Sequence, residues 1–357
     1  MKKMQKKIVF TGGGSAGHVT PNIAVINELD QSDWDIYYVG SKEGIEKELI
    51  ERRGIRYHSI SSGKLRRYID WQNITDIFRV VKGCLEARKY LKKVKPNVVF
   101  SKGGFVTVPV IIAAKTLNIP VIIHESDITP GLANRIAQRF ATKIFTSFDE
   151  ATAHFPSGKA KALGSPVRKE ITRGDKRKGL DFLQFGDSRP VLTVMGGSLG
   201  AKKINETVRA ALPWLTEKYQ VVHLCGKGHT DESLEDQRNY RQFEYVNEEL
   251  PDVLAATNTI ITRGGSNSIF EFLTLHLPML IVPLTRAQSR GDQILNAESF
   301  QEKGYAAVLE EEKLTEETLR EALQNIEDNR NNTIAQMKTY MAENPLDLII
   351  KELYVYH

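Results

Sequence analysis

The sequence predicts an α/β protein made of two doubly wound parallel-sheet domains. Short runs rich in Val, Ile and aromatic residues alternate with segments of helical periodicity, a pattern typical of buried parallel strands joined by helices. The alternation stops near the middle of the chain and then begins again. The length of 357 residues also suits two domains, each large enough to bury its own core.

Each half of the chain contains apolar runs that we expect to form the strands of one open sheet. Those of the first half are residues 7–11, 35–40, 97–101, 121–125 and 143–147. Those of the second half are residues 191–198, 221–225, 259–265, 279–283 and 306–310.

The domain boundary is expected in the polar segment 163–175, which contains Gly and Pro and shows no helical period before Lys176. We therefore place an N-terminal domain at residues 1–165 and a C-terminal domain at residues 166–344, facing each other across a cleft. Residues 345–357 have the pattern of an amphipathic helix, which we expect to pack back on the first domain.

The composition, 41% hydrophobic and 26% charged, is typical of a soluble globular protein. The N-terminal MKKMQKK precedes only a short apolar stretch, which is not the pattern of a signal peptide, so we expect a cytoplasmic protein. No apolar stretch reaches the roughly 20 residues that cross a bilayer, so any membrane contact should be at the surface. Cys84 and Cys225 lie in different predicted domains, which disfavours a structural disulfide, and metal-ligand spacing is absent.

A glycine-rich loop at residues 12–18 directly follows the first expected strand. It reads GGGSAGH and precedes a helix that we expect to begin at Pro21. Glycines let the backbone turn tightly and approach a ligand, and a helix N-terminus offers unpaired N–H groups to anionic or polar oxygens. The loop therefore predicts a binding site at the end of this strand.

Two further glycine turns occupy equivalent places. Residues 196–201 again lie between a strand and a helix, and Gly103-Gly104 also follow a strand. Two such loops facing one cleft suit a diphosphate ligand, and the third can approach a second anionic or polar substrate. For any single pair, a simple tight turn remains the alternative.

The first loop also fits the dinucleotide pattern G-x-G-x-x-G, which raises NAD binding as an alternative. That pattern requires an acidic residue about 20 residues further on, at the end of the second strand, to hold the ribose. Here the strand ends with Val39-Gly40-Ser41 and carries no carboxylate at its end. The sequence therefore disfavours an NAD enzyme.

Seven short segments form a specific pattern along almost the whole chain: GGGSAGHVTP, SKGGF, HESDITPGLAN, GSPVR, MGGSLGA, TRGGSNSIFE and DQILNA. Their order and spacing resemble those of the MurG family, peptidoglycan glycosyltransferases with the GT-B fold of two Rossmann-like domains. The resemblance implies an inverting transfer of N-acetylglucosamine from UDP-GlcNAc to the muramyl 4-hydroxyl of undecaprenyl-diphosphate-linked MurNAc-pentapeptide (lipid I), giving lipid II. It also implies a peripheral protein on the cytoplasmic face of the cell membrane, with cell-wall synthesis proteins as possible partners.

The resemblance implies a set of donor-binding residues in the second domain: Arg168, Gly197, Ser198, Ser266, Glu271, Asp292 and Gln293. Arg168 and Ser198 would hold the donor diphosphate, because a guanidinium and a hydroxyl both donate hydrogen bonds to phosphate oxygens. Glu271 would accept the two ribose hydroxyls, and Gln293 would contact the donor sugar with help from Asp292. Structural roles, as a surface charge, a helix cap or a solvated helix residue, remain the alternatives.

A second implied set lies in the first domain. On the donor-sugar side it comprises Ser15, Ala16, Gly17 and Asp127, and on the acceptor side Gly14, Gly103 and Gly104. His18 is the candidate general base for the acceptor hydroxyl, since imidazole titrates near neutral pH, with a structural hydrogen-bond role as the alternative. Glu125 could act as the base instead, or could orient its loop as a structural acceptor.

Residues 64–95 form a strongly basic segment. It has ten Lys or Arg against three acidic residues, an excess of seven, whereas the whole chain has a net charge of +5. Apolar residues recur in it at helical spacing: Ile74, Ile77, Phe78, Val81 and Leu85. Such a helix can bind an anionic membrane surface, unless its apolar stripe packs on the sheet. No aromatic interleaving or known motif accompanies the charge, so nucleic acid is not an expected partner.

The implied chemistry is direct displacement at the anomeric carbon, with the charge on the departing UDP stabilised by loop amides and Arg168. We expect no cofactor and no obligatory metal ion. Two other classes stay open. One is a UDP-GlcNAc 2-epimerase on a similar two-domain scaffold, and the other is a non-catalytic, membrane-associated nucleotide-sugar-binding protein.

Overall fold

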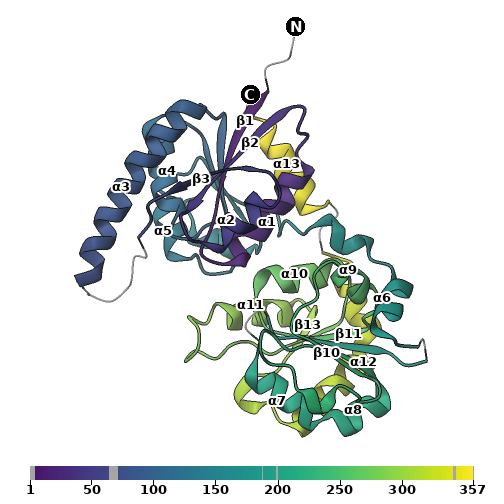
Figure 1. Cartoon of the computed structure of the whole chain (residues 1–357). Coiled ribbons are helices and arrows are strands. Elements are labelled where there is room, and N and C mark those ends of the chain that lie inside the picture. Colours follow the sequence, from purple (N-terminus) through teal and green to yellow (C-terminus); the bar gives the residue numbers. More distant parts are fainter. Residues whose placement is uncertain (1–4, 64–70, 187, 198–199, 341–342, 357) are drawn as a thin grey trace. The chain divides into compact units, whose positions relative to one another are not determined.

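The computed structural model describes residues 5–63, 71–186, 188–197, 200–340 and 343–356. The chain divides into two compact units (Figure 1). The first contains the chain up to Pro166 together with the segment from Glu343 onward, and the second begins at Val167. Each unit has its own parallel sheet, so the prediction of two doubly wound α/β sheets is confirmed.

In the described part of the first unit, parallel strands form a seven-stranded sheet in the order β3-β2-β1-β4-β5-β6-β7. The strands are β1 (Lys6–Thr11), β2 (Trp34–Ser41), β3 (Arg56–Ile60), β4 (Val98–Ser101), β5 (Val121–Glu125), β6 (Lys143–Thr146) and β7 (Ala160–Ala162). The helices are α1 (Ala16–Glu28), α2 (Ile45–Glu51), α3 (Trp71–Val94), α4 (Thr107–Thr116), α5 (Leu132–Ala137) and α13 (Pro345–Leu353), with a 3-10 turn at Glu150–His154.

Some elements of the first unit differ from the sequence prediction. The strands β3 and β7 are additional, and neither shows an apolar run, because β3 reads RYHSI and β7 is only AKA. Both lie at the edges of the sheet. The expected helix start at Pro21 is wrong: the extended backbone of Ser15 forms the N-cap, α1 begins at Ala16, and Pro21 lies inside the helix.

The two faces of the first sheet carry separate apolar cores. Alternate residues of β1 point to opposite faces, so Ile8 and Phe10 lie in one cluster and Val9 in the other. Residues of α13 are fully buried in the first cluster: Leu346, Ile349 and Leu353. An ion pair of 2.6 Å between Lys143 of β6 and Glu352 also joins this helix to the sheet. The C-terminal helix therefore packs on the first unit, beside α1.

In the described part of the second unit, parallel strands form a six-stranded sheet in the order β10-β9-β8-β11-β12-β13. The strands are β8 (Val191–Met195), β9 (Gln220–Leu224), β10 (Tyr240–Phe243), β11 (Thr259–Thr262), β12 (Met279–Ile281) and β13 (Ala306–Val308). The helices are α6 (Lys176–Leu183), α7 (Lys202–Ala210), α8 (Leu212–Lys218), α9 (Leu250–Ala256), α10 (Ser266–Thr274), α11 (Asp292–Glu302) and α12 (Glu316–Met337), with 3-10 turns at Lys169–Arg173, Glu232–Leu234 and Glu311–Lys313.

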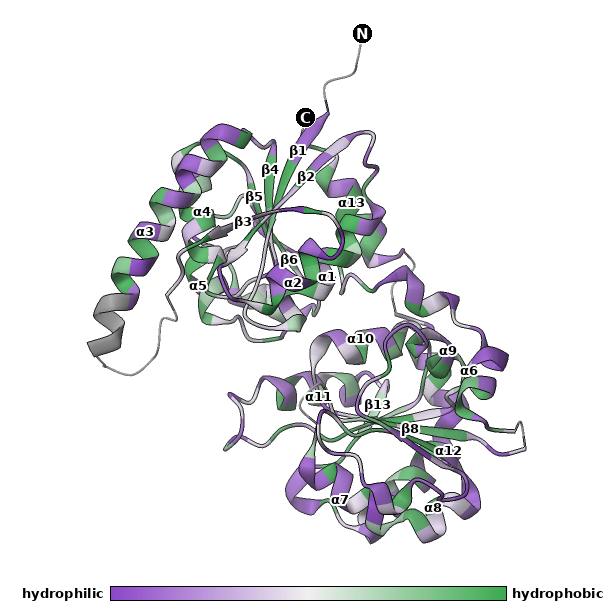
Figure 2. Ribbon diagram, in the orientation of Figure 1, coloured by the Kyte–Doolittle hydropathy of each residue, from purple (hydrophilic) through white to green (hydrophobic). Residues whose placement is uncertain are grey.

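Both sheets are mainly hydrophobic, and the helices that cover them alternate polar and apolar residues (Figure 2). The edge strand β10 is not predicted from the sequence, since it reads YRQF and mixes polar with aromatic residues. Helix α6 begins at Lys176, where the sequence pattern first becomes helical. Among the described residues, no helix has both the length and the apolar composition needed to span a bilayer.

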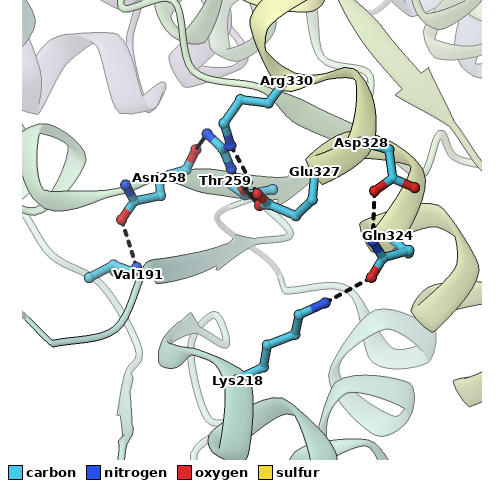
Figure 3. A network of polar contacts seen from close by, with 8 residues as sticks. All are labelled: Val191, Lys218, Asn258, Thr259, Gln324, Glu327, Asp328 and Arg330. Carbon is cyan, nitrogen blue, oxygen red and sulfur yellow. Dashed lines mark hydrogen bonds and ion pairs between the residues drawn. The ribbon is translucent and has the colours of Figure 1, made fainter.

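A polar network holds α12 against the amino ends of β8 and β11 (Figure 3). Arg330 donates to the carbonyl of Asn258 at 2.9 Å and to Oγ1 of Thr259 at 2.6 Å, and its charge is paired with Glu327 at 2.6 Å. Oδ1 of Asn258 accepts the backbone N–H of Val191 at 2.8 Å. The network lies at the amino ends of these strands, whereas the glycine turns follow the carboxyl ends. Since the ligand is expected at the glycine turns, we assign the network a structural role.

Candidate functional site

Both sheets reverse their strand order beside the first strand of the unit. In the first sheet β1 lies between β2 and β4, and in the second β8 lies between β9 and β11. Ligands of doubly wound sheets bind outside the carboxyl ends of the strands at such a reversal. The glycine turns after β1, β4, β8 and β11 lie at these ends, so each unit presents a pair of turns where a ligand is expected.

The turns after β1 and β4 contact each other. The N–H of Gly13 donates to the carbonyl of Gly103 at 3.3 Å. Gly104 has a φ of 91°, and a Cβ on it would lie 2.2 Å from the carbonyl oxygen of Gly13. Only glycine tolerates both the backbone conformation and this approach. The Gly103-Gly104 turn therefore packs directly against the loop at 12–18 and helps to fix its conformation.

Glu46 of α2 supports the same loop, a role that its position in the sequence does not reveal. Its side chain is fully buried and accepts hydrogen bonds from the N–H of Gly14 at 3.2 Å, the N–H of Ser41 at 3.0 Å and Oγ of Ser41 at 2.5 Å. A carboxylate does therefore reach the end of β2, but from the following helix. Because it is buried and engaged by protein donors, it fixes the loop and is not placed to bind a ribose.

A cavity of about 990 Å³ opens beside these turns in the first unit. Its lining includes Gly13, Gly14, Ser15, His18, Gly104 and Phe105, the β2–α2 loop with Lys42, and Arg79 of α3. The cavity thus brings together several residues predicted for the acceptor side. Two cations also line it, Lys42 and Arg79, and the latter pairs with Asp76 at 3.4 Å. Ala16 is exposed and Gly17 partly exposed in the adjoining first turn of α1.

His18 lies beside the Gly103-Gly104 turn. A Cβ on Gly103 would be 3.7 Å from Cε1 of His18, an ordinary van der Waals distance, so the imidazole ring lies against this turn. The backbone N–H of His18 donates to the carbonyl of Ser15 at 3.1 Å, which places the residue in the first turn of α1. The ring therefore belongs to the wall of the cavity formed by both glycine turns.

Glu125, at the end of β5, organises its own loop. Its carboxylate accepts N–H groups of Ser126 at 2.9 Å, Asp127 at 3.1 Å and Gly131 at 3.1 Å, and the amide of Asn134 at 2.9 Å. Burial raises the pKa of Glu125, and the charge of Asp127 raises it further, whereas these hydrogen bonds lower it; the net shift is upward. With four donors on it, Glu125 fits the role of loop-orienting acceptor better than that of a general base.

In the second unit, Arg168 and Glu271 form an ion pair. Nε and Nη2 of Arg168 donate to Oε1 of Glu271 at 3.3 and 3.1 Å. Burial raises the pKa of Glu271, whereas the guanidinium lowers it. The two residues predicted for the diphosphate and the ribose are therefore neighbours, and Arg168 is placed to orient the carboxylate.

The remaining donor-side residues lie around the ends of β8, β11 and β12. The carbonyl of Gln293 in α11 would be 2.5 Å from a Cβ on Gly264, so α11 packs directly on the turn that precedes Ser266. Oε1 of Gln293 accepts the N–H of Leu284 at 3.1 Å, and Asp292 pairs with Arg290 at 3.1 Å.

Gly197 and Ser198 belong to the turn after β8. Gly197 is exposed with a φ of 96°. Ser198 lies outside the described residues. Because Met195 of β8 is the register partner of Thr262 of β11, the Gly197 turn and the turn at 264–265 follow neighbouring strands. They form the glycine-turn pair of the second unit.

The outer face of α3 is apolar and exposed. Ile77 is 55%, Phe78 72%, Val81 54% and Leu85 65% exposed, so the alternative that this stripe packs on the sheet is wrong. The buried face of α3 is a different one, with Ala87, Leu91 and Val94. Lysines follow the stripe on the exposed side: Lys82, Lys89, Lys92 and Lys93. Of the predicted basic segment, residues 64–70 and the side chain of Ile74 lie outside the described part.

Family models match both halves of the chain. Residues 8–146 match the glycosyltransferase family 28 N-terminal domain, and residues 191–353 match the glycosyltransferase family 28 C-terminal domain. A curated relative from Shouchella clausii (strain KSM-K16) is 60% identical over 348 residues, 98% of each chain. It is named UDP-N-acetylglucosamine--N-acetylmuramyl-(pentapeptide) pyrophosphoryl-undecaprenol N-acetylglucosamine transferase.

Solved structures share the fold. The Acinetobacter baumannii MurG structure superposes with a TM-score of 0.78 at 22% identity, covering 98% of this chain and 99% of that one. The UDP-GlcNAc 2-epimerase from Methanocaldococcus jannaschii matches with a TM-score of 0.60 at 15% identity, over 90% and 92% of the two chains. The fold therefore accommodates both of the enzyme classes considered from the sequence, and it does not separate them.

Proposed function

Because the chain belongs to glycosyltransferase family 28 and, within it, to the MurG transferases, we propose that it moves N-acetylglucosamine from UDP-GlcNAc to the muramyl 4-hydroxyl of lipid I. The product is lipid II, the precursor for peptidoglycan synthesis. The observation that carries the proposal is the cavity of the first unit, where two touching glycine turns, His18 and two cations surround one space. Such a space suits a sugar linked to a diphosphate.

The second unit takes the donor in this proposal. Glu271 accepts the ribose hydroxyls, and Arg168, which pairs with it at 3.1 Å, orients the carboxylate and reaches the diphosphate. The turns at Gly197 and before Ser266 offer backbone N–H groups at the ends of neighbouring strands. Gln293 contacts the donor sugar from α11, with Asp292 beside it.

The first unit takes the acceptor and assists its attack. The muramyl 4-hydroxyl attacks the anomeric carbon as the bond from that carbon to the UDP oxygen breaks, so the configuration inverts. His18 accepts the hydroxyl proton, and UDP leaves with its negative charge stabilised by Arg168 and loop N–H groups. Ser15, Ala16, Gly17 and Asp127 adjoin the donor sugar. The sequence gives no reason for a cofactor in this reaction.

The lipid part of the acceptor requires contact with a membrane. The exposed stripe on α3, defined by Ile77, Phe78, Val81 and Leu85, adjoins Arg79, which lines the cavity. The stripe can therefore enter the anionic membrane surface while the linked diphosphate reaches the cavity. In this proposal the enzyme is a peripheral protein, and the resemblance to the MurG family supports the cytoplasmic face as its side of the membrane.

The proposal is tested with purified protein, labelled UDP-GlcNAc and a lipid I analogue in vesicles. Release of UDP that depends on lipid I is the expected result. Formation of N-acetylmannosamine would identify an epimerase, and binding without turnover a non-catalytic protein. In the same assay, His18→Ala should lose most turnover. Near-normal turnover of this variant would exclude an essential proton transfer by His18.

A further inference from the structure

The side chain of Lys102 is buried, although lysine normally keeps its ammonium group in water. The residue follows β4, directly precedes the Gly103-Gly104 turn and is only 1% exposed. Its Nζ lies 2.6 Å from Nδ1 of His124 and donates to Oγ of Ser126 at 2.5 Å. The proposed transfer does not use this group directly, so its burial beside the cavity needs another explanation.

The second contact of His124 fixes the direction of its hydrogen bond with Lys102. Nε2 of His124 lies 3.0 Å from the carbonyl of Gly164, which can only accept, so Nε2 carries the proton. Burial, followed by the charge of Lys102, lowers the pKa of His124, and the ring is therefore neutral. Its Nδ1 is then an acceptor, and Lys102 is the donor to both of its neighbours.

The charge of Lys102 is supported by the loop that it contacts. Burial lowers the pKa of Lys102 to about 7, while Glu125 and Asp127 act in the opposite direction. The ionisable groups facing Lys102 are thus His124, which is neutral, and these two acids. Near neutral pH, loss of the lysine proton leaves both acids without their buried counter-charge.

Lys102 connects the glycine turns with the loop at 124–131. Its own backbone N–H donates to the carbonyl of Thr11 at 3.0 Å, just before the first glycine loop. Asn134 connects the loop with the Gly103-Gly104 turn. Its side-chain amide donates a hydrogen bond of 2.9 Å to the carboxylate of Glu125, and the same amide nitrogen lies close to Gly103, 3.5 Å from the position that a Cβ on this glycine would occupy. A shift of the loop would therefore move the turn on which the ring of His18 lies.

We propose that Lys102 is a positioning residue for the transfer: through His124 and Ser126 its buried ammonium holds the 124–131 loop against the Gly103-Gly104 turn and so keeps the acceptor wall of the cavity in place. The kinetic part of this inference rests on the proposed function. The packing part does not, because it concerns the loop alone.

The test compares Lys102→Met with Lys115→Met in the full chain. Methionine keeps the length and apolar stem of lysine without its charge or donors, and Lys115 is an exposed lysine of α4 in the same unit. Amide hydrogen exchange of residues 124–131 should become faster in Lys102→Met alone. The kcat/KM for the lipid I analogue should fall about 100-fold, since small displacements near reacting groups have effects of this size.

The pH profile separates positioning from a general loss of stability. In the wild type, kcat/KM should decline above about pH 7 as Lys102 loses its proton, and this alkaline decline should be absent from Lys102→Met. If Lys102→Met does not fold, Ser126→Ala should show the same faster exchange of the loop with the lysine still present.

Unchanged exchange of residues 124–131 in the folded variant, or in Ser126→Ala, overturns the inference whether or not the wild type forms product. Wild-type product with unchanged kinetics in Lys102→Met overturns it as well. Absence of product from the wild type, with altered loop exchange in the variant, contradicts the proposed function and supports the packing role of Lys102.

Discussion

Removing two side chains from the exposed stripe of α3 should weaken membrane binding strongly without affecting the fold. Phe78 is 72% and Leu85 65% exposed, so most of each side chain is available to enter a membrane. Full burial of such a side chain contributes about 1.5–3 kcal/mol, and the exposed part accounts for about 1–2 kcal/mol. Phe78→Ser with Leu85→Ser should thus cost about 2–4 kcal/mol, a roughly 30- to 700-fold weaker affinity.

The assay is co-sedimentation with vesicles containing anionic phospholipid, at low and at high salt. The matched control is Val355→Ser, because Val355 is 61% exposed in the same unit but lies beyond α13, away from the stripe. Substitutions at such exposed sites change the free energy of unfolding by about 0.5 kcal/mol or less, so thermal unfolding should be the same for all variants. Wild-type vesicle affinity in the double variant would refute the reasoning.

Two further predictions concern the two units separately. Gly104→Ala should lower the free energy of unfolding by about 3 kcal/mol or more in urea titrations, because the new Cβ would clash with the carbonyl of Gly13 at a residue whose φ is positive. The control is Gly131→Ala, because a Cβ at Gly131 has no neighbouring atom within 4 Å. Equal free energies of unfolding for the two variants would contradict this prediction. Burial raises the pKa of Glu271 in the folded protein, which means that the fold favours the neutral carboxyl group. The protein therefore has the full stability from this group below the ordinary glutamate pKa, and it loses that stability as the pH rises through the raised pKa of the folded state. Glu271→Gln should therefore increase the free energy of unfolding at pH 7 more than at pH 4, while raising KM for UDP-GlcNAc; equal changes at both pH values would show that burial of the charge is not the cause.

The pattern of apolar runs was sufficient to predict both sheets, and the glycines that follow β1, β4, β8 and β11 were sufficient to predict tight turns at those strand ends. The edge strands β3, β7 and β10 escaped prediction because a half-covered strand does not need an apolar run. Helical periodicity identified the apolar stripe of α3. It could not say that this stripe faces outward, because α3 has a second apolar face against the core.

Residues that act through tertiary contacts were beyond the reach of sequence reasoning. Glu46 supports Gly14 and Ser41 from the helix after β2, and only the folded chain brings these groups within hydrogen-bond distance. The cluster of acidic residues after that strand was the available signal. Lys102 resembles an ordinary surface lysine in the sequence, and its burial depends on contacts with His124, which lies on another strand. The pairing of Arg168 with Glu271 likewise joins residues far apart in the chain.

The linkage formed by the protein tests the central claim most directly. Labelled UDP-GlcNAc, whose sugar is α-linked, should be incubated with a lipid I analogue, and the released glycan should be examined by NMR. The account predicts a disaccharide with N-acetylglucosamine β-linked to the 4-oxygen of the muramyl sugar, because displacement is direct and inverts the anomeric carbon. An α-linkage, attachment to another oxygen, or no disaccharide while a reference transferase is active would contradict it.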